Sequence, residues 1–181
     1  MNETLKTIYF RRAVRKYGPA PVPKKLIDEI LDAARMAPTS MNKQAWKFYV
    51  VTHPAEIKKI SDEIETVAKD LFHLSNEIAQ SASEDFVFHG APVVVFITMP
   101  KDNEWGAIDA GMCAQTMMLA AKSLGLDSCP VGFGKFVEQT PGYSNFKAAP
   151  SEKVQLAVLI GFGSENPVTK PRNKDNVTFL Q

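Results

Sequence analysis

Three arginines lie close together near the start of the chain, in the stretch FRRAVRKYGPAP. Arg11, Arg12 and Arg15 fall within five positions. Arg11 and Arg15 are four residues apart, so one helical turn would place them on the same side. A guanidinium group offers paired N–H donors that match the oxygens of a phosphate. The cluster therefore indicates either an anion-binding site or a solvated basic surface, and spacing alone favours the basic surface.

A second basic pair lies near the end of the chain, in TKPRNK. Lys170 and Arg172 are separated by Pro171, which keeps the backbone between them extended. The pair suits either a second phosphate clamp or an exposed tail. The whole chain carries 21 basic and 20 acidic residues, for a net charge of +1. This balance gives no overall electrostatic reason to bind nucleic acid or an anionic membrane, so any basic patch is local.

Two further stretches combine residue types that line ligands. PTSMNKQ, residues 38–44, places hydroxyl and amide side chains between a predicted helix and a predicted strand. These groups suit a polar ligand, although the stretch taken alone favours ordinary turn and capping chemistry. CPVGFG, residues 129–134, ends a predicted strand in glycines. Such glycines let backbone N–H groups approach a flat ligand, or simply form a tight turn.

The sequence lacks the residue combinations typical of a self-sufficient catalytic site. It contains no P-loop, no G-x-S-x-G and no G-x-G-x-x-G motif. His53, His73 and His89 have neither metal-ligand nor triad spacing. Cys113 and Cys129 form no C-x-x-C pair, so we expect no zinc site and no disulfide framework. Any demanding chemistry would therefore belong to a cofactor.

Helices and strands are interspersed along the 181 residues and predict one domain, a sheet sandwiched between helices. Helices are expected at 4–12, 23–36, 54–66 and 108–124. Strands are expected at 46–53, 92–99, 127–134 and 153–163, with a further possible strand at 176–180. The run PVVVFITM is apolar throughout, which is typical of a strand buried on both faces. Residues 67–87 are helical in tendency but poorly determined.

The chain shows no sign of membrane insertion or export. Its longest apolar run, at 91–99, is far shorter than the roughly 20 residues that span a bilayer. The first ten residues lack the basic start and apolar stretch of a secretory signal. With only two cysteines, the sequence predicts a reduced, cytoplasmic protein.

Taken in order, the four stretches resemble the nitroreductase family of flavin enzymes. The resemblance runs from RRAVRKYGPAPVPKKLIDEILDAARMAPTSMNKQAWKFYVV through HGAPVVVFI and DAGMCAQTMMLAAKSLGLDSCPVGFG to LAVLIGFGSENPVTKPRNKDNV. It implies a nitroreductase-like α+β fold with a mixed central sheet sandwiched by helices. It also implies an intertwined homodimer with two FMN molecules in clefts at the interface. Residues 1–181 would form a single domain whose tail, from about residue 164, extends over the partner subunit.

The resemblance further implies which residues contact FMN. Arg11 would contact the phosphate or ribityl chain, and Arg15 would lie near the N1–C2=O edge of the ring. The backbone of Arg12 and Ala13 would contribute, and Ala13 stands where the family often has serine, which removes one side-chain hydrogen bond. Lys170 and Arg172 match the C-terminal phosphate clamp.

Two loops complete the implied cofactor site. One approaches the flavin from the partner subunit, and the other lies along the ring with a backbone N–H facing flavin N5, the atom that accepts hydride. The first loop contains Pro38, Thr39, Ser40 and Asn42, with Gln44 close behind, and the second contains Pro130, Val131, Gly132 and Phe133.

The activity that the resemblance implies is FMN-dependent oxidation of NADH or NADPH, with reduction of nitroaromatic, quinone or similar electron-poor acceptors by a ping-pong mechanism. A cation beside N1–C2=O would stabilise the reduced ring, so positioning and electrostatics would replace a catalytic side chain. The alternatives are other flavin chemistry, such as reductive dehalogenation or flavin breakdown, and a non-enzymatic dimer that binds flavin or another anion. Phe72, His73, Phe86 and Phe88 would line a substrate channel or belong to the core, and we favour the core for most of them.

Overall fold

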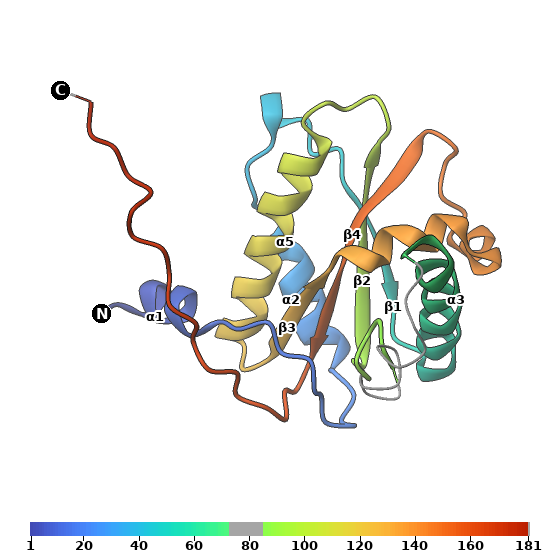
Figure 1. The fold of residues 1–181 in the computed structure, drawn as a ribbon, viewed down its shortest axis with the longest axis horizontal. Helices are drawn as coiled ribbons and strands as arrows, with labels where there is room; N and C mark the ends of the chain where they lie inside the picture. The colour runs from blue at the N-terminus through green and yellow to red at the C-terminus, as the bar shows by residue number, and fades with distance from the viewer. Residues whose placement is uncertain (73–84, 181) are drawn as a thin grey trace.

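The computed structural model describes residues 1–72 and 85–180 and places helices on both faces of an open sheet (Figure 1). The strands are β1 (Lys47–Val51), β2 (Val93–Pro100), β3 (Asp127–Val131) and β4 (Glu152–Gly161). Their order is β1-β2-β4-β3, and every pair of neighbouring strands is antiparallel. The expected mixed sheet is therefore wrong for the described strands, and the parallel pairing of Ala13 with Ser128 is an isolated bridge outside them.

The helices divide between the two faces of the sheet. They are α1 (Glu3–Phe10), α2 (Lys24–Arg35), α3 (Pro54–Phe72) and α5 (Gly106–Ser123), with short 3-10 helices η1 (Ser40–Asn42), η2 (Gly132–Gln139) and η3 (Pro141–Phe146). The apolar cluster on one face joins α2 and α5 to the sheet, and the cluster on the other face joins α3, η2 and η3 to it. Among the described helices, none is long and apolar enough to cross a membrane.

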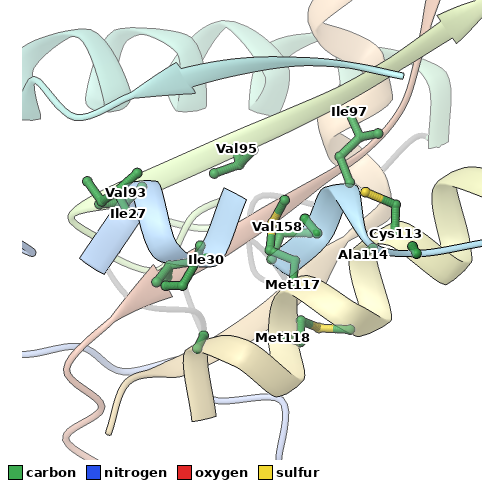
Figure 2. Close-up of a cluster of buried hydrophobic side chains, with 14 of the residues drawn as sticks. Ile27, Ile30, Val93, Val95, Ile97, Cys113, Ala114, Met117, Met118 and Val158 are labelled. Carbon is green, nitrogen blue, oxygen red and sulfur yellow. The ribbon is translucent and has the colours of Figure 1, made fainter. Parts of the chain in front are cut away.

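β2 lies at the centre of the fold and is buried on both faces, as the sequence predicted. Val93, Val95 and Ile97 pack with α2 and α5 in the cluster of Figure 2. Val94 and Phe96 belong to the opposite cluster. Because side chains alternate along a strand, an uninterrupted apolar run supplies a core on each side of the sheet.

Three elements differ from the expectation. α3 continues to Phe72 because its buried positions Ile57, Ile60, Ile64 and Ala68 keep the helical period past Thr66. β3 ends at Val131 and the chain turns into η2. The possible strand at 176–180 is wrong, since these residues are exposed and have no strand partner among the described residues.

Both ends of the chain lie away from the layered body (Figure 1). No residue of α1 is buried, and its apolar side chains Leu5, Ile8 and Tyr9 are exposed. The tail from Ser164 onward forms no helix or strand and is largely exposed. Of the aromatic residues with two possible roles, Phe88 is fully buried, Phe86 is half-buried and Phe72 is exposed, while His73 lies outside the described residues.

Candidate functional site

The arginine-rich segment lies beside β3. Val14 is 2% exposed, and its N–H donates to the carbonyl of Ser128 at 3.1 Å. The Tyr17 hydroxyl donates to the carbonyl of Val14 at 2.7 Å and closes the segment on itself. The bridge between Ala13 and Ser128 is parallel, so both segments leave it in the same direction. Arg15 lies two residues beyond the bridge on its segment, and Pro130 lies two residues beyond it on β3.

The three arginines have different environments. Arg12 is tied to the protein: its Nη1 donates to the carbonyls of Tyr9 at 2.6 Å and Arg11 at 2.7 Å, and its Nη2 donates to Thr169 Oγ1. Arg11 Nη1 is buried yet has no hydrogen-bond partner in residues 1–72 and 85–180. The Arg15 side chain is exposed. Arg12 thus stabilises the segment, while Arg11 keeps a donor available to a ligand.

The first part of the tail is fastened to this segment. Ser164 N–H donates to the carbonyl of Lys16 at 2.9 Å, and Glu165 Oε1 accepts from the backbone N–H of Arg15 at 2.5 Å. The Thr169 contact with Arg12 then brings the neighbouring Lys170 to the same edge of the molecule. Arg172 follows two residues later and is exposed, as Lys170 is. Sequence reasoning missed Glu165 and Thr169, because nothing in their spacing relates them to the arginines.

The charges of the arginines reach the end of β3. Burial raises the pKa of the Cys129 thiol, while the positive charges of Arg15 and Arg11 act in the opposite direction. Burial also raises the pKa of the Tyr17 hydroxyl. Both groups therefore stay neutral at neutral pH, so the charges at this edge of the sheet are those of the arginines and of Asp127 and Glu165.

The end of β3 presents backbone to open space. Pro130 is exposed, Val131 is buried, and no atom of residues 1–72 and 85–180 outside its chain neighbours lies within 4 Å of the position that a Cβ at Gly132 would take. Phe133 packs against neighbouring rings, with its centroid 5.7 Å from that of Phe86 and 6.0 Å from that of Phe136. A flat ligand can therefore approach the backbone at Gly132 without a side chain in the way.

The loop at residues 38–44 has an unusual backbone. Met41, Asn42 and Gln44 have φ angles of 53°, 54° and 47°, a left-handed region that non-glycine residues seldom adopt. Gln44 supports this shape, since its N–H donates to Thr39 Oγ1 at 3.1 Å and its Nε2 donates to Asn42 Oδ1 at 3.0 Å.

Asp109 holds this loop against α5, and sequence reasoning missed it. Its Oδ1 accepts the Ser40 N–H at 3.1 Å, while its Oδ2 is buried without a partner among the described residues. The one available signal was an acidic residue at the start of an otherwise apolar helix. Pro38, at the start of the loop, is exposed. The polar groups of the loop therefore lie outside the apolar core of their own chain.

The two halves of the predicted cofactor site do not meet within one chain. Ser40 contacts the first turn of α5, whereas Ser128 and the arginine segment follow its last turn (Figure 1). At about 1.5 Å per residue, the helix separates these regions by about 20 Å. One chain therefore brings together Arg11, Arg15, Lys170 and the end of β3, but not the loop at 38–44.

The fold is that of an α+β protein with an arginine-bearing edge beside β3. A model of the nitroreductase family matches residues 8–162, and the chain belongs to that family. A 4-nitrobenzoate reductase of Pseudomonas putida is 29% identical and is matched over 86% of this chain and 83% of its own. An FMN reductase of Bacillus subtilis that uses NAD(P)H is 30% identical, over 73% of this chain and 55% of its own.

A crystal structure shows the same fold with a ligand. The nitroreductase of Desulfitobacterium hafniense DCB-2, solved with bound FMN, has a TM-score of 0.87 and 26% identity, and the match covers 100% of both chains. The family and the α+β fold that the sequence predicted are thus confirmed.

Proposed function

We propose that the protein is an FMN-dependent oxidoreductase that takes hydride from NADH or NADPH and reduces nitroaromatic, quinone or similar acceptors. The observation that carries the proposal is the buried Arg11 Nη1, which has no partner among the described residues. A buried guanidinium donor needs an acceptor, and a phosphate supplies one. The family and the FMN-bound neighbour make FMN the phosphate-bearing ligand that fits best.

The residues present fit this cofactor. Arg11, Lys170 and Arg172 would hold the phosphate, with the backbone of Arg12 and Ala13 beside it. Arg15 would stand at the ring edge, where its positive charge favours the reduced state. The backbone from Pro130 to Phe133 would lie along the ring. When bound, FMN supplies the hydride chemistry, and the chain contributes binding, orientation and electrostatics.

The complete site requires two copies of the chain. The loop with Pro38, Thr39, Ser40, Asn42 and Gln44 would reach the cofactor of the partner, since it lies about 20 Å from its own arginines. Exposed apolar side chains on α1 and α5 supply an interface: Ile8 is 44% exposed, Phe10 62% and Ile108 49%. The tail from about residue 164 would extend over the partner, and the dimer would reside in the cytoplasm.

Absorbance spectroscopy of the purified protein tests the proposal. We expect a flavin spectrum that bleaches during anaerobic titration with NADH or NADPH and returns when a nitroaromatic compound or a quinone is added. Protein that neither carries nor takes up FMN would contradict the cofactor. Bound FMN without turnover of either acceptor class would contradict the reductase and favour another flavin reaction.

Sedimentation or light scattering tests the dimer independently.

Mixing two inactive variants tests whether the site is shared between subunits. One variant is altered at Arg11 and the other in the loop at 38–44. A mixed dimer would contain one site in which both the arginine segment and the loop are unaltered. Recovery of activity on mixing would support a shared site, and a monomer with full activity would contradict it.

A further inference from the structure

A hollow of about 430 Å³ opens beside the end of β3, between η2 and the last turn of α3. This volume is within the range of small-molecule sites, about 300–1,000 Å³. Its lining residues are Phe72, Gly132, Phe133, Lys135, Phe136 and Gln155. Gly132 also belongs to the backbone that we propose lies along the cofactor ring, so the hollow adjoins the place of reaction.

Gln155 enters this hollow through a bulge in β4. The pairing with β2 steps from Ile97–Leu156 to Thr98–Val154, which leaves Gln155 as an extra residue without a partner on β2. A bulge redirects the side chain that it carries and is frequent beside active sites. The irregularity therefore accounts for a polar side chain pointing from a central strand into an aromatic hollow.

The amide of Gln155 has an unused donor. Its Nε2 is buried and has no hydrogen-bond partner in the described part of the chain. Burying an amide N–H without an acceptor is unfavourable, so buried amides are normally paired. A ligand oxygen in the hollow would satisfy this donor.

The rest of the lining defines what kind of ligand carries that oxygen. Phe72 lies with its ring centroid 6.0 Å from that of Phe133 and 5.7 Å from that of Phe136, so three rings form an apolar wall. Lys135 is exposed, with Nζ 5.1 Å from the centroid of Phe136. It is the one charged residue among those lining the hollow. The combination suits a flat aromatic ring with a negative substituent.

We propose that this hollow is the acceptor subsite and that it selects aromatic carboxylates. The ring packs against Phe72, Phe133 and Phe136, and the carboxylate accepts the Gln155 N–H and pairs with the Lys135 ammonium. This assignment rests on the proposed function, because it requires the cofactor at Gly132.

Calorimetric titration of the FMN-loaded protein with benzoate and benzamide tests the subsite without any turnover. The two ligands share a ring and differ in charge. We expect benzoate to bind about tenfold more tightly than benzamide. Gln155→Met, which keeps the length of the side chain and removes the donor, lowers the benzoate affinity about tenfold. Lys135→Gln lowers it about threefold, since an exposed ion pair contributes less.

Gln139→Leu and Lys59→Gln are the matched controls, because both residues are exposed and line no part of the hollow. Gln155→Glu adds a second test, since it places a negative charge beside the carboxylate and weakens benzoate more than benzamide. Equal affinities of the two ligands for the wild-type protein, or an unchanged benzoate affinity in Gln155→Met, would overturn the proposal. The proposed function is tested in parallel by measuring the oxidation of NADH and NADPH with nitrobenzene as the acceptor. Nitrobenzene carries no carboxylate, so its turnover tests the reductase activity and not the proposed selectivity of the hollow.

Discussion

Two regions of the molecule differ in how a buried charged group is hydrogen-bonded. At the start of β4, the buried carboxylate of Glu152 accepts from Lys47 Nζ, from Thr98 Oγ1 at 3.0 Å and from Tyr49 Oη at 3.1 Å. At the edge of β3, Arg11 Nη1 is buried with no partner among the described residues. A group whose role is to hold the fold together has its partners in the chain. Arg11 Nη1 lacks such a partner in the described part of the chain, which is why we propose a ligand phosphate as its acceptor.

The two regions also differ in packing. Gly134 lies against β4, where a Cβ would approach Ala157 Cβ at 2.5 Å and Ala157 N at 2.8 Å. At Gly132, two residues earlier, the described part of the chain places no atom within 4 Å of that position beyond the glycine's own neighbours. Glycine at 134 thus allows η2 to pack on the sheet, whereas glycine at 132 keeps a surface clear. This difference can be tested by substitutions at each region.

The largest expected effect is on packing. Gly134→Ala forces a methyl group into Ala157 and lowers the free energy of unfolding by about 3 kcal/mol. Gly132→Ala is the matched substitution and changes the free energy of unfolding by less than about 0.5 kcal/mol, since the added methyl group meets open space. Urea unfolding of both variants measures this difference. Equal destabilisation would contradict the contrast between the two glycines.

Arg11→Ala should weaken FMN binding by about 1.5–3 kcal/mol, because a charge-assisted hydrogen bond to the phosphate is lost. The stability of the cofactor-free protein should change little, since no hydrogen bond of Arg11 Nη1 within the described residues is broken. Flavin fluorescence during dilution measures the affinity. Arg35→Ala removes a guanidinium on α2, far from β3, and serves as the control; unchanged FMN affinity in Arg11→Ala would remove Arg11 from the site.

Glu152→Gln should lower the free energy of unfolding by about 1.5 kcal/mol at neutral pH. Burial raises the pKa of Glu152, but hydrogen bonds from Lys47, Thr98 and Tyr49 outweigh it and lower the pKa below the usual 4.5. A lowered folded pKa contributes stability above the unfolded value, and this contribution is lost as the pH falls through the folded pKa.

Unfolding curves between pH 7 and pH 3 check this dependence. The gap between wild type and Glu152→Gln should be constant at the upper end and shrink below about pH 4.5. Glu104→Gln, at an exposed position, should leave the curves unchanged. A gap that persists at the lowest pH would mean that shape, and not charge, stabilises this network.

The smallest effect on binding is expected for Arg15→Gln. The Arg15 side chain is exposed, and its hydrogen bond to Glu165 comes from the backbone, so the segment should stay in place. Loss of the positive charge at the ring edge should lower the flavin reduction potential while FMN affinity falls less than in Arg11→Ala. Spectroelectrochemical titration measures the potential; a value equal to that of the wild type would place Arg15 away from the ring.

Much of the fold could be predicted from local sequence. The apolar run of β2 specified a strand buried on both faces, and Gly125, with φ of 78°, ends α5 as its position indicated. The end of α3 and the loss of the strand at 176–180 could not be predicted in this way. Both depend on whether a distant element is available to pack against or to pair with.

The sequence by itself determined the family and most of the element types, because both follow from motifs and from the spacing of residues along the chain. Only the tertiary structure distinguished Arg12, which donates to Thr169 of the tail, from Arg11, whose Nη1 has no partner among the described residues. It also placed the loop at 38–44 at the opposite end of α5 and exposed the bulge at Gln155. These features arise from contacts between residues far apart in the chain, so no local pattern encodes them.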